Sequence, residues 1–422
     1  MSSGYGRGAR ILSVGIATTG LVTFAYFSVA SHVLGPGAYG QVALLWSVLF
    51  VTVSVLYRPV EQLLSRTIAG RRARGLEHAH PLRTPALLQG GFALAFLVAA
   101  LALRGPLQRD LFGGSEALYW ILVVAVVAYA ASYFARGWLA GHQWFGLYGG
   151  LVFFEAVARL AFALAAAVGL ATGKTVVALG MAAAPLVSLV VLPWAFARRA
   201  RGAAQAAPDR ARGEELGLGR GGRFAAAVLV VMVAEQTLLN AAVLTTRATA
   251  DAAAAGFVFS VLLIARAPLQ LFQAVQGSLL PHLAGLEAQA GGAEVARAVR
   301  VTVLAIAGFA LAVAAGLLIL GPWAMDLLFD DPVRYGRAGL ALVALGMGFH
   351  LMAGTLNQAA LARDHAGRAA AAWAVGAAAF VGWLLAPVVD DALLRAELGY
   401  LGAAALVCAL LAVVYRRGTS GW

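Results

Sequence analysis

Long apolar runs, each near the length of a membrane-spanning helix, recur from one end of this 422-residue chain to the other. A helix needs roughly 20 mostly apolar residues to cross a bilayer, where no water is present to satisfy irregular backbone. Hydrophobic residues make up 62% of the chain and charged residues 12%, whereas soluble domains average about 45–50% and about 25%. The sequence therefore predicts an all-α polytopic membrane protein.

Twelve apolar runs have the length and composition of a span. The first begins after two arginines, but it reaches Val33 and is too long for the core of a signal peptide, so we expect it to be uncleaved. The predicted spans are 11–33, 41–64, 85–104, 116–140, 148–172, 175–196, 224–246, 254–280, 300–321, 337–361, 367–388 and 394–415.

Arginine and lysine lie mainly on one side of these spans, which predicts the orientation of the protein. The termini and the loops on their side carry 21 of the 31 basic residues, and the opposite loops carry 7. This bias predicts a multi-pass protein of the bacterial cytoplasmic membrane with both termini in the cytoplasm. It also explains the net charge of +12 without a nucleic-acid partner.

An internal repeat divides the spans six and six. Gly105-Pro106 follows the third span and Gly321-Pro322 the ninth, and the same 216-residue offset carries Ala38-Tyr39-Gly40 onto Ala254-Ala255-Gly256. Six spans per copy give both copies the same orientation, so a pseudo-two-fold axis along the membrane normal is expected, with two lobes flanking a cavity. The predicted domains are an N-terminal lobe over 1–196, a cytoplasmic linker over 197–223 and a C-terminal lobe over 224–422.

Polar side chains inside the eighth span provide the clearest sign of a site. Arg266, Gln270 and Gln273 fall at i, i+4 and i+7, on one helical face. Ionisable residues in spans are costly and usually face a cavity or a partner. We predict that this face lines a cavity and binds substrate: arginine suits phosphate, and amides suit sugar hydroxyls.

Other spans also hold polar residues, and each of these has two explanations: contact between packed helices, or a role in a site. Arg58 and Glu61 share a face of the second span, and Glu155 and Arg159 share one of the fifth; each is either a structural ion pair or a cavity-facing pair. Gln236 and Asn240 share a face of the seventh span, where hydrogen bonding between helices is the alternative. In the tenth span Asn357 is a further substrate-binding candidate. Candidates for carrying a coupling proton are Glu61, Glu155, Glu235 and His350.

No motif for chemistry is present. The chain has no GxxxxGK[ST] phosphate loop, no HExxH sequence and a single cysteine, Cys408. We therefore expect no enzyme activity, no cofactor and no metal.

The segments Leu34-Gly-Pro-Gly-Ala-Tyr-Gly40 and Arg58-Pro-Val-Glu-Gln-Leu-Leu-Ser-Arg66 resemble the polysaccharide-transporter flippases of the multidrug/oligosaccharidyl-lipid/polysaccharide exporter superfamily. So does the run from Arg266 to Gln273. The resemblance implies two six-helix lobes around a central cavity and export of lipid-linked oligosaccharides by alternating access. Related lipid II flippases use cationic cavity residues for pyrophosphate, a role that Arg266, Arg58 and Arg159 would take here.

The resulting hypothesis is a flippase for polyprenyl-pyrophosphate oligosaccharides in surface polysaccharide assembly. Its partners would be that substrate, the membrane lipids, and a polysaccharide polymerase or glycosyltransferases. Two alternatives stay open: a cation-coupled multidrug exporter of the same superfamily, which would need a carboxylate-centred cavity, and a non-transporting membrane scaffold for polysaccharide enzymes.

Overall fold

The computed structural model describes residues 2–73, 82–203, 218–249, 251–265, 292–328, 336–363, 365–386 and 388–417. Helices and turns account for all of them, and these residues contain no strand. Within these described ranges, ten helices are long and apolar enough to cross a membrane. The protein is a polytopic, all-α membrane protein, as the sequence predicted.

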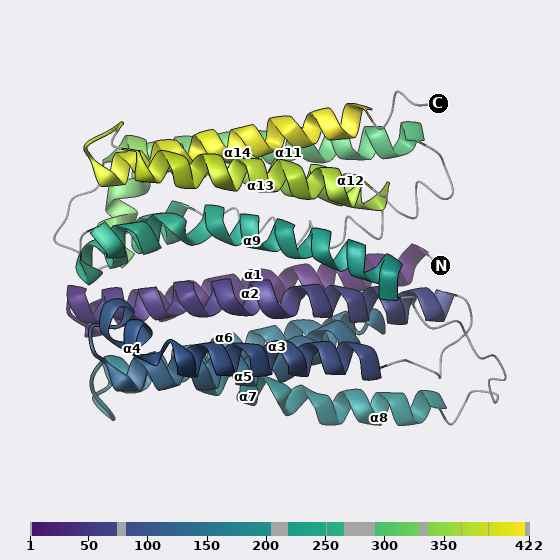
Figure 1. Ribbon diagram of the computed structural model, residues 1–422, viewed down its shortest axis with the longest axis horizontal. Coiled ribbons are helices and arrows are strands. Elements are labelled where there is room, and N and C mark those ends of the chain that lie inside the picture. The colour runs from purple at the N-terminus through teal and green to yellow at the C-terminus, as the bar shows by residue number, and fades with distance from the viewer. Residues whose placement is uncertain are drawn as a thin grey trace. The chain divides into compact units, whose positions relative to one another are not determined.

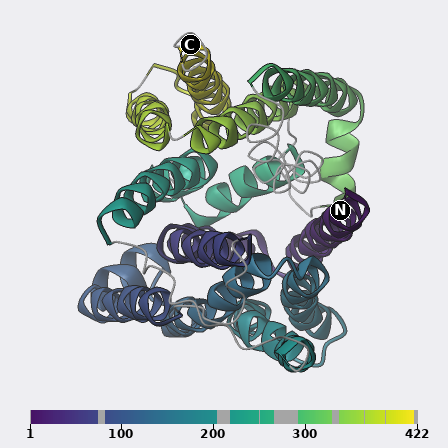
Figure 2. The ribbon, with the colours of Figure 1, turned by 90° about the vertical axis from the view of Figure 1, so that its right-hand side faces the viewer.

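The chain folds into two compact units. Unit 1 comprises Met1–Val33 and Leu45–Leu229, and unit 2 comprises Leu34–Leu44 and Val230–Trp422. In both units the long helices run side by side (Figure 1) and are seen end-on in Figure 2. The helices of unit 1, with α2 beginning in unit 2, are α1 Ser2–Val33, α2 Pro36–Ala73, α3 Arg83–Ala102, α4 Arg104–Pro106, α5 Glu116–Gly141, α6 Phe145–Ala167, α7 Lys174–Ser188 and α8 Leu192–Ala203.

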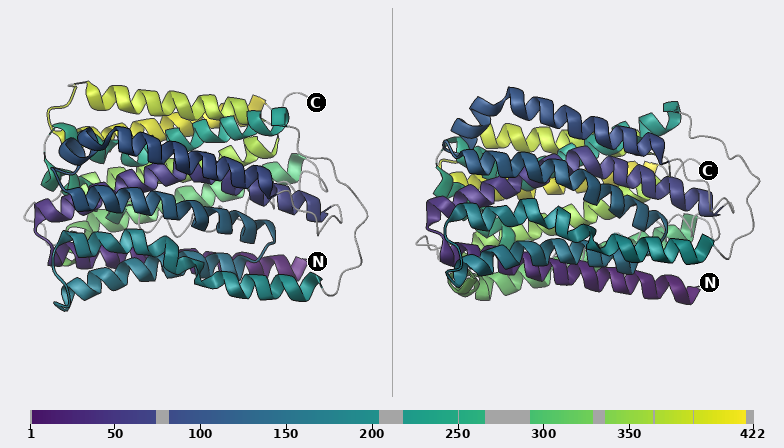
Figure 3. Two further views of the ribbon diagram at one scale, coloured as in Figure 1. Left: turned by 60° about the horizontal axis from the view of Figure 1, so that its bottom comes forward. Right: turned by 90° about the horizontal axis from the view of Figure 1, so that it is seen from below.

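Unit 2 is built from the helices that follow α8. Figure 3 shows the helices in two further orientations. A shorter apolar helix, Ala252–Ala265, covers the start of the predicted eighth span; the remainder of that span lies outside the described residues. The other helices are α9 Leu218–Thr249, which starts in unit 1, α11 Gly292–Leu328, α12 Arg337–Ala362, α13 Ala366–Leu385 and α14 Ala392–Arg417.

Two predicted elements differ in detail from the observed ones. The sixth span is not one helix: α7 and α8 are joined by a 3₁₀ turn, Leu189–Val191, which begins four residues after Pro185. The proline ring and its missing N–H weaken the helix in this region. The predicted linker 197–223 is partly helical, because α8 continues to Ala203 and α9 begins at Leu218.

Two residues that the 216-residue offset aligns contact each other at the start of α2. A Cβ added at Gly256 would lie 2.7 Å from the Cα of Gly40, so the two glycines that the 216-residue offset aligns touch each other. Beside them the hydroxyls of Tyr39 and Ser260 lie 2.9 Å apart. The repeat is not uniform, however, since the helix stops near Leu103 before Gly105-Pro106 but continues through Pro322.

Close helix contacts through glycine organise the interior of unit 1. α1 and α6 meet where a Cβ on Gly15 would lie 3.3 Å from the Cα of Gly149. α2 and α5 meet where a Cβ on Gly137 would lie 2.8 Å from the backbone oxygen of Glu61. Small residues permit such approach between membrane helices, where burial of apolar surface does not itself favour association.

We expect Gly137→Ala to destabilise the protein, because its methyl group would overlap the backbone of α2 at Glu61. Overpacking of this kind costs about 1–3 kcal/mol and would appear as a lower apparent Tm of the purified protein in detergent. Gly20→Ala is the matched control, since no heavy atom lies within 4 Å of its added Cβ. Equal melting temperatures for the two variants would show that α2 and α5 are not held this closely.

Candidate functional site

The helical hairpin α5–α6 brings four charged or hydroxyl side chains together inside unit 1. A short turn at Gln143, whose φ is +58°, reverses the chain between the two helices. Ser132 and Arg136 lie one turn apart on α5, and Glu155 and Arg159 lie one turn apart on α6. Because the helices are antiparallel, both pairs face each other across the hairpin.

Glu155 is the centre of this cluster and is 1% exposed. Ser132 Oγ donates to its Oε1 at 2.5 Å, and Arg136 Nη2 donates to its Oε2. Arg159 Nη1 lies 3.9 Å from the same Oε2. An unpaired buried carboxylate would be very unfavourable in a membrane interior, so these donors are what permits Glu155 to be there.

Arg159 is held mainly by neutral groups. Its Nη1 donates to the hydroxyl of Tyr129 at 2.9 Å, and its guanidinium lies 5.0 Å from the ring centre of Trp46 and 5.8 Å from that of Phe50. The side chain is 3% exposed, and its Nε has no hydrogen-bond partner among the residues that the structure describes. Aromatic faces attract a guanidinium but leave its formal charge uncompensated.

The second predicted pair, Arg58 and Glu61, belongs to the same region. The hydroxyl of Tyr148 donates to Glu61 Oε1 at 3.0 Å. Arg58 and Arg136 both lie close enough to act electrostatically on the Glu61 carboxylate. Arg136 and Arg159 thus share the one carboxylate of Glu155, and the partly buried Arg58 and Glu61 lie near them.

Arg136 lies inside the predicted fourth span, 116–140, but it was not among the predicted site residues. It lies within α5, is 8% exposed, pairs with Glu155 and stacks 4.4 Å from the ring centre of Tyr133. A signal existed: Ser132 and Arg136 are four residues apart. Folding α5 against α6 about residues 142–144 places that pair opposite Glu155 and Arg159.

Unit 2 holds a smaller buried group around His350 of α12. His350 Nε2 lies 3.5 Å from Glu235 Oε1 of α9. The His350 ring packs edge-on against Trp373, with the ring centres 5.4 Å apart, and Trp373 Nε1 donates to Asn357 Oδ1 at 3.2 Å. The structure therefore joins three of the predicted residues, Glu235, His350 and Asn357.

The remaining predicted residues divide into two sets. Gln236 and Asn240 share a face of α9, and Asn240 Nδ2 donates to Gln236 Oε1 at 3.2 Å. Arg266, Gln270 and Gln273, the predicted cavity stripe, lie outside the described residues. In the part of the chain that is described, no three His, Cys, Asp or Glu side chains are grouped to hold a metal ion.

Similarity to known proteins identifies the type of fold. No family model matches the chain. It is 29% identical over 403 residues to the uncharacterized protein Rv1510 of Mycobacterium tuberculosis, covering 91% of this chain and 84% of that protein.

Solved structures of similar fold are MATE transporters. The eukaryotic MATE transporter AtDTX14 aligns with a TM-score of 0.72 at 14% identity, over 98% of this chain and 97% of that one. An inward-facing multidrug resistance MATE family transporter of the MOP superfamily gives 0.67 at 13%, covering 97% of each chain. The bent form of Vibrio cholerae VcmN gives 0.63 at 15%, over 99% and 97%. At these identities the likeness establishes the fold.

We expect Arg136→Ala to destabilise the protein strongly, because Glu155 would lose its closest cationic partner while remaining buried. Breaking a buried ion pair from one side costs about 3–5 kcal/mol. Chemical unfolding in detergent, monitored by tryptophan fluorescence, measures the loss.

The double variant Arg136→Leu/Glu155→Leu is the informative companion, since it removes both charges together. It should recover much of the stability lost by Arg136→Ala. Equal or greater loss in the double variant would show that the pair does not act as a unit.

Proposed function

We propose that this protein is an exporter of anionic, lipid-linked headgroups, and that its substrate is a polyprenyl-pyrophosphate oligosaccharide moved by alternating access. The MATE-type fold supports the class of transporter. The observation that carries the substrate assignment is that two buried guanidinium groups, those of Arg136 and Arg159, share the single carboxylate of Glu155.

The chemistry of Arg159 supports an oxyanion ligand. A guanidinium keeps its charge at any working pH and offers several N–H donors in one plane, which matches phosphate oxygens. In this structure Arg159 and Arg136 share the carboxylate of Glu155, and Arg136 lies much closer to it. The other contacts of Arg159 are with neutral groups such as the hydroxyl of Tyr129. A pyrophosphate would supply the missing negative charge.

A second candidate, export of cationic compounds, is favoured by one observation, the fold similarity to a multidrug resistance transporter. A cation needs an uncompensated carboxylate to bind. In unit 1 both Glu155 oxygens already accept hydrogen bonds, and Glu61 accepts one from Tyr148. This arrangement favours the anionic substrate.

We expect Arg159→Gln to slow headgroup translocation roughly tenfold or more, since a hydrogen bond to a charged group contributes about 1.5–3 kcal/mol. The assay uses proteoliposomes that contain a polyprenyl-pyrophosphate oligosaccharide with a fluorescent sugar, and it follows quenching from outside. Arg109→Gln is the control, because Arg109 is exposed. Wild-type rates in the Arg159→Gln variant would remove Arg159 from the mechanism, and transport of ethidium instead of the lipid would favour the second candidate.

For energy coupling we propose the Glu235–His350 pair of unit 2. The structure brings this acid and this imidazole within 3.5 Å of each other. Glu155, by contrast, accepts hydrogen bonds from Ser132 and Arg136, and we assign it a structural role.

If the pair carries the coupling proton, Glu235→Gln should abolish the response of transport to an imposed pH gradient. Exchange of substrate without a gradient should remain. The Gln236→Leu variant, altered at the adjacent residue, should keep the gradient response; its loss there too would argue against a specific role for Glu235.

A further inference from the structure

A pocket of about 460 Å³ lies in unit 1 between α3, α5 and the α7–α8 junction. Its walls are almost entirely apolar, and its lining includes Ala86, Gly90, Phe134, Trp138, Leu192 and Phe196. α3 forms one wall of the pocket. Only 17% of its most apolar 18-residue stretch is buried inside the protein. Since α3 is a membrane span, its unburied face meets lipid, and the pocket is a recess at the lipid-facing side of the protein.

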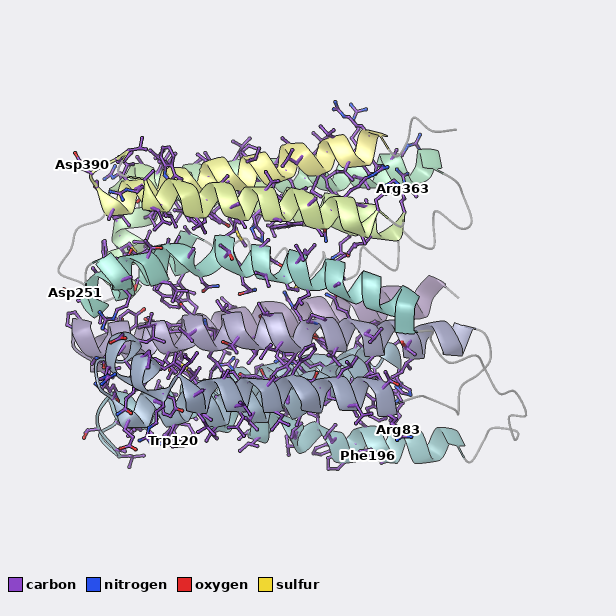
Figure 4. The ribbon with its side chains drawn as sticks, in the orientation of Figure 1. Arg83, Trp120, Phe196, Asp251, Arg363 and Asp390 are labelled. Atoms are coloured by element: carbon purple, nitrogen blue, oxygen red, sulfur yellow. The ribbon has the colours of Figure 1, made fainter. Side chains whose placement is uncertain are left out.

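The rim of the pocket is basic. Leu82 lines the pocket and Arg83 follows it as the first residue of α3. On the other side Phe196 lines the pocket, and Arg198, two residues later in α8, lies with its guanidinium 5.4 Å from the ring centre of Trp144. Trp144 packs edge-on against Trp138 of the lining. Arg83 and Phe196 are labelled at the same end of the molecule in Figure 4.

The beginning of α3 adds further donors at this rim. Its N-cap residue is Leu82, which has no side-chain acceptor, and its first turn contains no acidic residue. The first backbone N–H groups of a helix have no partner within the helix, and together with the helix dipole they favour an anion such as phosphate. Arg83 carries its positive charge at the same place.

Gln89 provides an independent sign of a ligand. It lines the pocket and is 5% exposed; its Nε2 donates to the backbone oxygen of Ala130 at 2.8 Å. Its Oε1 is buried and has no hydrogen-bond partner among the described residues. A buried acceptor without a donor is rare in proteins. Water held by the ester oxygens of a lipid can donate to Gln89 Oε1, whereas an alkane chain cannot.

The depth of Gln89 indicates which part of a lipid would meet it. Gln89 is six residues into α3, about 9 Å from its start at a rise of 1.5 Å per residue. The headgroup region is roughly 5–7 Å thick on each side of a bilayer. The glycerol and ester groups, with the water they bind, form the inner edge of that region, so Gln89 lies close to them.

We propose that this pocket binds an anionic glycerophospholipid of the membrane leaflet facing Arg83. The phosphate lies at the start of α3 beside Arg83 and Arg198, the glycerol region lies at Gln89, and one acyl chain fills the apolar pocket. By the arginine distribution this leaflet is the cytoplasmic one, whose anionic lipids attract basic residues. The site is separate from the buried arginine cluster.

Binding is tested on the full-length purified protein by native mass spectrometry with phosphatidylglycerol or phosphatidylcholine added. We expect wild type to retain phosphatidylglycerol with about tenfold higher apparent affinity than phosphatidylcholine. Arg83→Ala/Arg198→Ala should reduce that preference to near unity. Equal retention of the two lipids by wild type would overturn the proposal.

A matched pair of glycine variants tests the pocket itself. An added Cβ meets no heavy atom within 4 Å at either Gly90 or Gly91, but only Gly90 lines the pocket. Gly90→Phe should fill the pocket and abolish tight phosphatidylglycerol retention, whereas Gly91→Phe should leave it unchanged. Equal retention by the two variants would contradict a pocket-bound chain.

A photo-cross-linking measurement on wild type does not depend on either variant folding. Phosphatidylglycerol with a diazirine on one acyl chain should label peptides containing residues 82–90 and 130–138. Labelling confined to other helices would overturn the assignment.

Discussion

The burial of the Glu155 carboxylate is the constraint on which the organisation of unit 1 depends. A carboxylate that is 1% exposed within membrane-spanning helices is tolerated only if cations and hydrogen-bond donors surround it. Arg136, Ser132 and Arg159 supply them, which fixes the register of α5 against α6. That register in turn places Tyr129 of α5 beside Arg159 of α6.

Glycine contacts and the charge cluster support each other. The close approach of Gly137 to the backbone at Glu61 holds α2 against α5, and this brings the second carboxylate near Arg136. Unit 1 therefore concentrates guanidinium groups, whereas the buried group of unit 2 pairs one glutamate with one histidine. The different chemistry of the two groups is why we assign headgroup binding to the first and proton coupling to the second.

The fold was largely predictable from the sequence, because membrane helices are encoded by run length and hydropathy. All-α architecture followed from that pattern alone, and the aligned glycines Gly40 and Gly256 are found in contact. The i, i+4 spacing correctly placed Glu155 with Arg159 and Gln236 with Asn240. The 3₁₀ turn between α7 and α8 could not be predicted, since Pro185 shows that the helix is weakened there but not how the backbone responds.

The candidate site was only partly predictable. Periodicity reports which residues share a face of one helix, but not which face of another helix it meets. For this reason Arg136 was not recognised as a partner of Glu155, and Trp46 and Phe50 were not recognised as neighbours of Arg159. The pairing of His350 with Glu235 likewise joins residues 115 positions apart, which no local pattern indicates.

The central claim is that the buried arginines bind a pyrophosphate anion. Isothermal titration of the purified protein with geranyl pyrophosphate and, separately, with tetraphenylphosphonium tests it most directly. We expect saturable binding of the pyrophosphate, weakened about tenfold or more by Arg159→Gln, and no saturable binding of the cation. Tight binding of tetraphenylphosphonium together with no binding of geranyl pyrophosphate would contradict the account.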